Sequence, residues 1–356
     1  MATRRARDHR RNLTPGRGIE TEHDMTTKVA INGFGRIGRC VLRALVEQGR
    51  SDIEIVAIND LAPAETGAHL LRFDSTHGRF PHEVRVAGDV LEVAGRAIRI
   101  SAERAPEALA WQDVDVVLEC TGVFTDRDSA ARHLENGAGR VLVSAPCKSA
   151  DRTVVFGVNE GDITPGDRVI SNASCTTNCL APVAQVLDDA FGIETGYMTT
   201  IHSYTGDQPS LDTAHKDLYR ARAAASNIIP TSTGAARAVG LVLPRLAGRL
   251  DGSAIRVPTP NVSAVDLCFM AREAVTVDAV NDAMRAAAAG PMAGILTVTD
   301  DPLVSMDFNH DATSAIFATD QTRITEGGMI RVLSWYDNEW GFSCRMLDVA
   351  AAMGRV

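Results

Sequence analysis

A strand, a glycine-rich turn and a helix follow one another near the start of the chain, and this order constrains the fold more than any other feature. The stretch KVAINGFGRIGRCVLRALVEQG (28–49) passes from β-branched residues into an amphipathic helical pattern. Its junction reads Gly33-x-Gly35-x-x-Gly38. A glycine pattern between a strand and a helix is typical of a turn that approaches the phosphates of a dinucleotide.

A second strand supports this reading. The stretch IEIVAIND (53–60) ends in Asp60, 22 residues past Gly38, which is the usual separation for a carboxylate that binds a ribose hydroxyl. In such a unit Gly33 permits the tight turn, Gly35 lets the backbone approach a pyrophosphate, and Gly38 lets the helix pack on the strand. The alternative is an ordinary strand–loop–helix connection. The presence of Asp60 at the end of the second strand makes this alternative the weaker interpretation.

More short apolar strands follow in the first half, at VDVVLECTG (114–122), RVLVSAP (140–146) and RVISNAS (168–174). Such runs, separated by helical or loop material, predict an α/β fold with a Rossmann-like parallel sheet covered on both faces. Ligands bind beyond the carboxyl ends of these strands. Thr121 and Ser144 stand at two of those ends, so we expect them to line the cofactor site, although each also fits a plain turn.

Length and composition limit the remaining classes. A chain of 356 residues predicts two domains. Its net charge of −9 argues against nucleic-acid binding as the main role, and no apolar run approaches the roughly 20 residues of a membrane helix. Seven scattered cysteines without a zinc-like CxxC pair predict a reduced, cytoplasmic protein and no metal site.

The first 24 residues differ from the rest. They carry six arginines and almost no apolar residues, which predicts a disordered extension. The arginines faintly suggest a transit peptide, but Pro15, Gly16 and Gly18 would break an amphipathic helix. Met25 directly precedes the first strand, so an upstream start that the cell does not use is a second interpretation.

Cys175 lies in SNASCTTNC (171–179), among hydroxyls and amides rather than apolar residues. That setting indicates a thiolate that does chemistry. If Cys175 opens the helix CTTNCLAPVAQVLDDAFG, the helix dipole and free N–H groups are expected to lower its pKa. Pro182 fits poorly inside a helix, so a start near Pro182 is the alternative. Cys179, four residues on, is interpreted as a packed thiol.

A base for this cysteine is found in MTTIHSYTGDQ (198–208). His202 stands at the end of a predicted strand, and a Cys–His pair explains how a thiol acts as a nucleophile near neutral pH. A structural histidine is the alternative. Two further features suit an anion: the turn TSTGAA (231–236) before an apolar helix, and Arg256 in a mostly apolar strand. For Arg256 an internal ion pair is the alternative.

Together these segments resemble the phosphorylating glyceraldehyde-3-phosphate dehydrogenases, from Lys28 to the C-terminus. The motifs that carry the resemblance are INGFGRIGR, SNASCTTNC, HSYTGDQ, RARAAASNIIPTSTGAA, RVPTPNVS and SWYDNEWGFS. The resemblance implies NAD-dependent oxidation of D-glyceraldehyde 3-phosphate to 1,3-bisphosphoglycerate, in glycolysis or gluconeogenesis. Cys175 would form a thiohemiacetal and then a thioester, His202 would accept the hydroxyl proton, and inorganic phosphate would release the product.

The resemblance also assigns binding residues, position by position. It implies Thr205 and Arg256 for the substrate's own phosphate, and Asn338 for the nicotinamide carboxamide. The remaining assignments are the site of the attacking phosphate (Ser174, Thr176, Thr233, Gly234), the cofactor loop (Arg36, Ile37), the adenosine ribose (Asp60) and the adenine side (Arg104).

The family architecture implies a cofactor domain of residues 25–174 and an α+β catalytic domain of residues 175–340 with a mixed or antiparallel sheet. A C-terminal helix (341–356) would pack back on the cofactor domain. The loop 204–228 would cross a subunit interface in a homotetramer.

The chain departs from the common family pattern at a few positions. Phe342 replaces a tyrosine, and Cys344 replaces a polar residue. Thr213-Ala214 stands where strictly NAD-dependent members have Leu-Pro, which implies some tolerance of NADP. Asp60 favours NAD because a carboxylate repels a 2′-phosphate.

Two other functions are weighed against this one. Erythrose-4-phosphate dehydrogenases are close relatives, but Thr205 and the TSTGAA turn favour the phosphorylating enzyme. A non-catalytic RNA-binding protein with the same fold is disfavoured by the intact Cys175 and His202 and by the acidic net charge.

Overall fold

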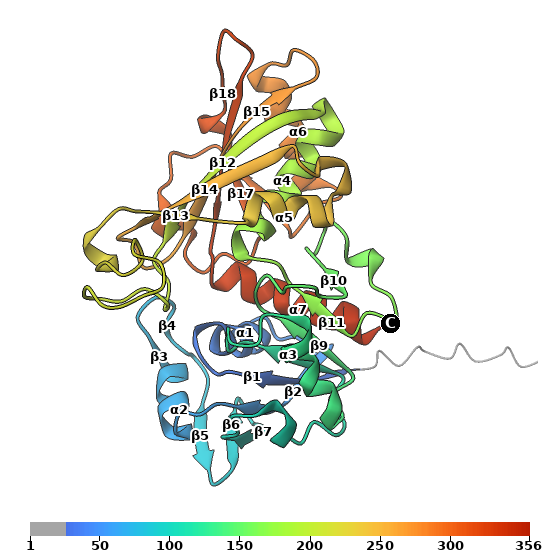
Figure 1. Cartoon of the computed structure of the whole chain (residues 1–356), viewed down its shortest axis with the longest axis vertical. Coiled ribbons are helices and arrows are strands. Elements are labelled where there is room, and N and C mark those ends of the chain that lie inside the picture. Colours follow the sequence, from blue (N-terminus) through green and yellow to red (C-terminus); the bar gives the residue numbers. More distant parts are fainter. Residues whose placement is uncertain (1–25) are drawn as a thin grey trace, which may run out of the picture.

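The structure is a computed structural model and describes residues 26–356. The predicted disordered extension, residues 1–24, lies outside the described residues. Two large β-sheets with their helices form the two halves of the molecule, one below and one above the long helix α7 (Figure 1). Within the described residues, no helix is both long and apolar enough to cross a bilayer.

The first sheet has nine strands in the order β10-β11-β9-β8-β1-β2-β7-β6-β5. The strands from β10 to β7 pair in parallel, and β7-β6-β5 is an antiparallel extension. Their bounds are β1 (Thr27–Asn32), β2 (Ile53–Asn59), β5 (Val84–Ala87), β6 (Val90–Val93), β7 (Arg96–Ser101), β8 (Val116–Glu119), β9 (Arg140–Val143), β10 (Arg152–Thr153) and β11 (Val169–Ser171). The predicted parallel sheet is confirmed.

After β1 the chain first adds β2 on one side of it and later adds β8 on its other side, so the strand order reverses beside β1. Such a switch point leaves a crevice at the carboxyl ends of the strands, where open α/β sheets bind ligands. The β1–α1 turn and the residues that follow β8 meet at this crevice. The fold thereby places the predicted glycine loop at the position where a ligand binds.

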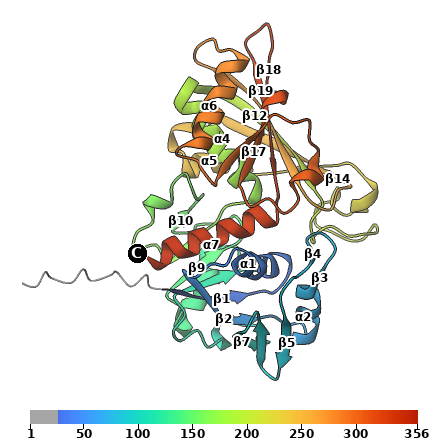
Figure 2. The ribbon, with the colours of Figure 1, turned by 180° about the vertical axis from the view of Figure 1, so that it is seen from behind.

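The helices of this half are α1 (Arg36–Glu47), α2 (Ala64–Arg72), α3 (Arg127–Ala131) and the C-terminal α7 (Trp340–Gly354). A short hairpin, β3 (Phe73–Asp74) with β4 (Gly78–Arg79), follows α2. Helix α7 packs beside α1 and against β1, β8 and β9, and its apolar residues belong to the same hydrophobic core. Figure 2 shows α7 running between the first sheet and the elements of the second half.

The second sheet has eight strands, seven of them in the order β13-β14-β12-β15-β19-β17-β16, with β18 paired to β19. It is mixed: β12 pairs with β14 in parallel and with β15 antiparallel, which confirms the predicted sheet type. Its strands are β12 (Ile193–Ser203), β13 (Ile229–Ser232), β14 (Leu250–Val257), β15 (Ser263–Ala271), β16 (Leu296–Thr299), β17 (Ala315–Ala318), β18 (Arg323–Ile324) and β19 (Ile330–Tyr336). Helices α4 (Cys175–Phe191), α5 (Ala235–Val242) and α6 (Val277–Ala289) share a second hydrophobic core with this sheet.

Helix α4 begins at Cys175 and contains Pro182, so the alternative start near Pro182 is wrong. An internal proline costs roughly 3 kcal/mol in an isolated helix. Most of α4 is buried, Pro182 included. The burial of most of the helix in the second core outweighs this local cost, and a sequence pattern does not contain the free energy of that burial.

Candidate active site

The glycine loop has the close backbone packing that a dinucleotide site needs. Gly33 has a φ of +94°, and a Cβ there would lie 2.7 Å from the backbone nitrogen of Thr121. A Cβ on Gly38 would lie 2.2 Å from the carbonyl oxygen of Gly33, so α1 can pack on β1 only with glycine at this position. Nothing lies within 4 Å of a Cβ built on Gly35, which leaves open space above the loop.

A groove of about 310 Å³ lies over this loop. It brings together five of the predicted cofactor residues: Gly33, Gly35, Asp60, Arg104 and Thr121. The carboxylate of Asp60 is fixed at the edge of the groove, because it accepts hydrogen bonds from the backbone N–H groups of Phe34 (2.6 Å) and Ala62 (2.8 Å).

The start of α1 has no side-chain cap, so its first N–H groups are available for a phosphate. The open space above Gly35, the uncapped helix and the held carboxylate of Asp60 therefore fit a dinucleotide.

The side chains of three other predicted cofactor residues do not line this groove. Arg36 forms ion pairs with Asp74 and Glu339, at the start of α7. Ile37 packs against the first hydrophobic core, and the backbone N–H of Ser144 bonds to the carbonyl of Glu119 in β8 (3.0 Å). Arg36 and Ile37 still lie in the first turn of α1, where N–H groups have no acceptor within the helix.

Cys175 is held at the first position of α4 by its neighbours. Ala173, two residues earlier, has a φ of +56°, which turns the chain sharply out of β11. Ser174 caps the helix by accepting a hydrogen bond from the N–H of Thr177 (3.1 Å). Asn178 donates its side-chain amide to the carbonyl of Ser174 (3.0 Å). The amides and hydroxyls of SNASCTTNC thus fix the position of the thiol.

The thiol meets a histidine at the junction of the two halves. Cys175 packs against both hydrophobic cores, and its Sγ lies 3.4 Å from Nε2 of His202, near the end of β12. Nδ1 of His202 lies 2.7 Å from the carbonyl oxygen of Ser203. A carbonyl only accepts, so this short contact requires the proton on Nδ1. The nearby Nη1 of Arg256, at 3.2 Å, is another donor and cannot bond to a protonated Nδ1. The lone pair of Nε2 therefore faces the thiol.

Burial sets the pKa of both groups. Loss of solvent, followed by the positive charge of Arg256, lowers the pKa of His202 to about 3. Burial raises the pKa of the Cys175 thiol, while Arg256 and hydrogen bonds at the start of α4 act in the opposite direction. The predicted lowering of this pKa by the helix N-terminus is wrong, because desolvation outweighs it. The 3.4 Å spacing allows the thiol proton to move to Nε2, which would pair the new anion with an imidazolium.

Replacing Arg256 by glutamine should raise the pKa of Cys175 further. The arginine charge favours the thiolate, so its removal leaves less thiolate at any pH below the thiol pKa. We expect iodoacetamide to alkylate Cys175 several-fold more slowly at pH 7, with the pH profile moved upward. Mass spectrometry of the Cys175 peptide measures this without substrate. Arg237→Gln, which removes an exposed arginine paired with Asp251 (2.9 Å), serves as the control. An unchanged profile in Arg256→Gln would contradict the assigned charge effect.

Arg256, in β14, is not part of an internal ion pair. Its Nη1 donates to the carbonyl of Ser203 (2.9 Å) and to the hydroxyl of Thr205 (3.0 Å). Between residues 26 and 356, no carboxylate oxygen lies within 4.0 Å of this guanidinium, and its buried Nε has no hydrogen-bond partner. An arginine in this state offers its charge and donors to an anion.

A second group of donors lies where two helices begin. The hydroxyl of Thr177 in α4 donates to the carbonyl of Ala235, the first residue of α5 (3.3 Å), so the two N-termini are adjacent. Thr233 and Gly234 precede α5, and the Thr233 hydroxyl accepts from the N–H of Ala235 (3.1 Å). Adjacent helix N-termini favour an anion. Thr176 differs from Thr233 in that its hydroxyl is buried and is bonded to the phenol of Tyr336 (2.8 Å).

Three residues that were not singled out from the sequence also support the site: Tyr336, Ser203 and Ser263. The hydroxyl of Tyr336 bonds to Thr176 and to Thr200 in β12 (2.9 Å), and its ring stands edge-on to His202 at 5.9 Å. The amide oxygen of Asn338 accepts from the hydroxyls of Ser203 (2.9 Å) and Ser263 (2.8 Å). These bonds orient the amide nitrogen of Asn338. All three lie inside the motifs quoted above, which was the signal for finding them.

Comparison with known proteins agrees with this geometry. The family model described as the NAD binding domain of glyceraldehyde 3-phosphate dehydrogenase matches residues 27–127, and the model of the C-terminal domain matches residues 174–338. The chain is 66% identical over 332 residues to the glyceraldehyde-3-phosphate dehydrogenase of Cereibacter sphaeroides, which covers 93% of this chain and 100% of that protein.

Two more relatives carry the same name. The protein of Xanthobacter flavus is 65% identical over 334 residues, with 93% of this chain and all of the relative covered. The protein of Geobacillus stearothermophilus is 56% identical over 330 residues, with 92% of this chain and 98% of the relative covered. From the two domain models and these near full-length matches, the chain belongs to the glyceraldehyde 3-phosphate dehydrogenase family.

Proposed function

We propose that this chain is an NAD-dependent oxidoreductase that oxidises D-glyceraldehyde 3-phosphate to 1,3-bisphosphoglycerate with inorganic phosphate. One observation carries the proposal: the Sγ of Cys175 lies 3.4 Å from Nε2 of His202, whose lone pair faces it. Arg256, which has no carboxylate partner among the described residues, lies beside the same histidine. The family membership and the NAD-binding domain model support the cofactor and the reaction class.

The proposed chemistry divides between two side chains. The thiolate of Cys175 attacks the aldehyde carbon, so a carbon–sulfur bond forms and the carbonyl π bond breaks. The oxygen takes the proton from Nε2 of the His202 imidazolium and becomes the hydroxyl of a thiohemiacetal, which returns Nε2 to its neutral form. His202 Nε2 removes the hydroxyl proton, and its Nδ1–H bond to Ser203 keeps the ring oriented. Bound NAD supplies the acceptor for the hydride that leaves the same carbon. The product of this step is a thioester on Cys175, which phosphate then cleaves to the acyl phosphate and the free thiolate.

The remaining proposed roles follow from the two groups of donors. Arg256 and Thr205 hold the substrate's phosphate. Ser174, Thr233 and Gly234 surround the attacking phosphate at the start of α4 and α5. Thr176 is part of the same proposed phosphate site, and its hydroxyl is bonded to the phenol of Tyr336. Asn338, oriented by its two serine partners, holds the nicotinamide carboxamide and so selects the ring face.

For the cofactor, Asp60 favours NAD, and the proposal includes some tolerance of NADP. A second hollow, of about 530 Å³, shares Gly35, Asp60 and Leu61 with the first. It is lined by Arg39, whose Nε has no hydrogen-bond partner. Space and a positive charge next to Asp60 are features that a 2′-phosphate needs. Thr213 and Ala214 are exposed in the loop 204–228.

The same loop supports the proposal of a homotetramer. It carries large apolar side chains that are strongly exposed in the single chain, including Leu211 (77%), Leu218 (83%) and Tyr219 (62%). Exposed apolar groups of this size mark a surface that another chain covers. The seven cysteines are free thiols, which suits the reducing cytoplasm. The proposal also keeps the division into residues 25–174 and 175–340, with two separate cores.

The proposal is tested by reduced-cofactor formation from glyceraldehyde 3-phosphate, with NAD and then NADP, each with and without inorganic phosphate. We expect strong turnover with NAD that requires phosphate, because the thioester is cleaved by phosphate. NADP should support slower turnover. Erythrose 4-phosphate is the control substrate. Weak turnover that ignores phosphate, together with faster turnover of erythrose 4-phosphate, would assign the chain to the alternative dehydrogenase.

A further inference from the structure

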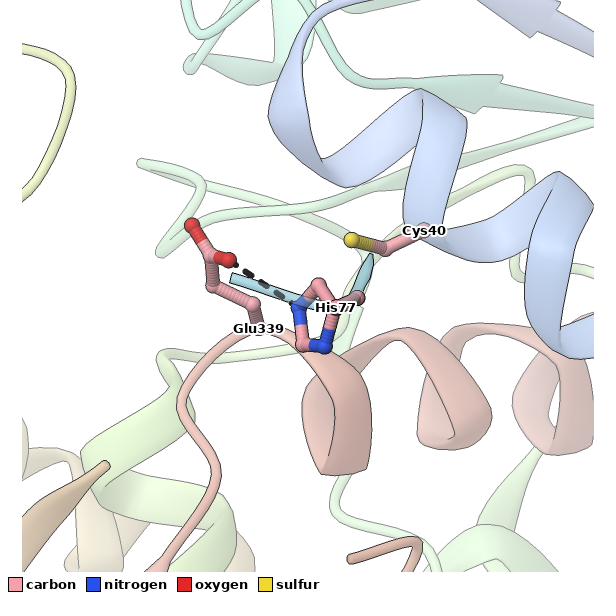
Figure 3. Close-up of side chains that lie close together, drawn as sticks. All are labelled: Cys40, His77 and Glu339. Atoms are coloured by element: carbon pink, nitrogen blue, oxygen red, sulfur yellow. Dashed lines mark hydrogen bonds and ion pairs between the residues drawn. The ribbon is translucent and has the colours of Figure 1, made fainter. Parts of the chain in front are cut away.

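A second cluster of reactive side chains lies away from Cys175 and His202. The Sγ of Cys40, a ring nitrogen of His77 and a carboxylate oxygen of Glu339 all lie within 4.8 Å of one another (Figure 3). Cys40 is on α1, His77 is in the turn between β3 and β4, and Glu339 directly precedes α7. The side chains of Cys40 and His77 are essentially fully buried, and Glu339 is mostly buried.

The hydrogen bonds around His77 assign its tautomer. Nε2 of His310 lies 2.9 Å from the carboxylate of Glu47, which only accepts, so Nε2 of His310 carries the proton. A neutral His310 then accepts at Nδ1. The Nδ1 of His77 lies 3.1 Å from it and must donate. A neutral His77 therefore has its lone pair on Nε2, 3.2 Å from Oε2 of Glu339.

Two acceptors that face each other at this distance need a cation between them. A proton on Nε2 is one such cation, and a metal ion is the other. The thiol of Cys40 at the same point favours a metal, because sulfur, imidazole nitrogen and carboxylate oxygen are all zinc ligands. A bond from the second ring nitrogen to a fixed partner, as His77 makes to His310, is the usual support of a metal-bound histidine.

The charge around the cluster also favours a cation. Glu339 and Asp74 contribute two carboxylates, and Arg36 is paired with both. Asp337 and Arg39 are further charged groups near Cys40 and offset each other, so one negative charge remains before the thiol is counted. The Nε of Arg36 donates to Oε1 of Glu339 (2.9 Å), and its Nη2 donates to Oε2, which also faces Nε2 of His77.

We propose that Cys40, His77 and Glu339 bind one zinc ion, with water as the fourth ligand. Ligand atoms of a tetrahedral zinc site are about 3.3–3.7 Å apart, so the His77–Glu339 spacing already fits and the sulfur moves inward by about 1 Å. Binding breaks the S–H bond of Cys40, forms a sulfur–zinc bond and releases the proton to solvent. The ion would link α1, which begins at the glycine loop, to Glu339, the residue after Asn338. The sequence prediction of no metal site would then be wrong, because the ligands lie far apart in the chain.

The test uses Cys175→Ser protein, because the active-site thiol and imidazole are themselves a pair of metal ligands. The reduced, chelator-treated protein is titrated with Co²⁺, whose thiolate charge-transfer and tetrahedral d–d bands report sulfur ligation. Competition with Zn²⁺ then gives the zinc affinity. We expect one ion per chain and a higher melting temperature with zinc.

Matched variants in this background decide the assignment. Cys40→Ser should remove the charge-transfer band and weaken binding at least about 100-fold, and His310→Gln should weaken it about 10–100-fold. Cys344→Ser is the control, because Cys344 is another buried cysteine at the α1–α7 contact, bonded to Gln48 (3.1 Å). It should keep the band. Circular dichroism checks folding, and His77→Gln replaces Cys40→Ser if the latter is unfolded. No cobalt binding, a band that persists without Cys40, or a band lost equally in Cys344→Ser would overturn the proposal.

Discussion

Replacing Cys175 by serine should abolish the oxidation of glyceraldehyde 3-phosphate, with kcat/KM lowered by at least about 10⁴-fold. The hydroxyl of serine is far less acidic than a thiol, and burial at this position disfavours an anion still further. The thiohemiacetal therefore does not form. Steady-state kinetics measures the loss, and NAD affinity should stay within a few-fold of the original value.

Cys179→Ala is the matched control for this variant. Cys179 lies one turn further along α4, is fully buried and belongs to the second hydrophobic core. Its replacement leaves a small cavity, so we expect a modest loss of thermal stability and activity within a few-fold of the original. Activity lost equally in both variants would show that α4 tolerates no change, and near-normal activity in Cys175→Ser would rule out covalent catalysis by Cys175.

Replacing His202 by asparagine should lower kcat by about 10²- to 10⁴-fold. The asparagine amide can still donate to the carbonyl of Ser203, so the strand and Arg256 keep their contacts. What is lost is the Nε2 lone pair 3.4 Å from the thiol. Without it the thiol has no proton acceptor and the hydroxyl of the thiohemiacetal has no base. Both the kcat and the alkylation rate of Cys175 at pH 7 should fall together.

The pH dependence separates this variant from a merely misfolded one. In His202→Asn the thiolate forms only by loss of a proton to solvent, and burial raises the thiol pKa. Activity and alkylation should therefore increase steadily as the pH rises above 8. His69→Asn, at an exposed position of α2, is the control and should behave like the original protein. An unchanged alkylation profile in His202→Asn would contradict the proton transfer from Cys175 to Nε2.

The local parts of the fold and of the site were predictable from sequence. The glycine loop and the strands β1, β2, β8, β9 and β11 follow from patterns over neighbouring residues, whereas the sequence left the start of α4 open between Cys175 and Pro182. Glycine at position 38 is required by a backbone contact within the β1–α1 turn, whereas Gly33 packs against the backbone of Thr121, which follows β8. The motifs also pointed to Cys175, His202 and Arg256, whose functional roles remain predictions.

Other features depend on residues that are distant in the chain. Tyr336, Ser203 and Ser263 support the site through bonds that span 60 to 160 positions, and no spacing rule selects them. The cluster of Cys40, His77 and Glu339 exists only because α7 packs beside α1. The side chain of Arg36 is directed to Asp74 and Glu339 for the same reason.

The sequence by itself determined the parallel sheet and the dinucleotide loop, and it predicted which side chains carry the chemistry. These depend on backbone periodicity and on hydrogen bonds between near neighbours, which a sequence states directly. The tertiary structure alone decided the solvent exposure of each group. It reversed the expected direction of the Cys175 pKa, because the packing of two cores against the partly exposed thiol removes enough water to outweigh the field of one helix.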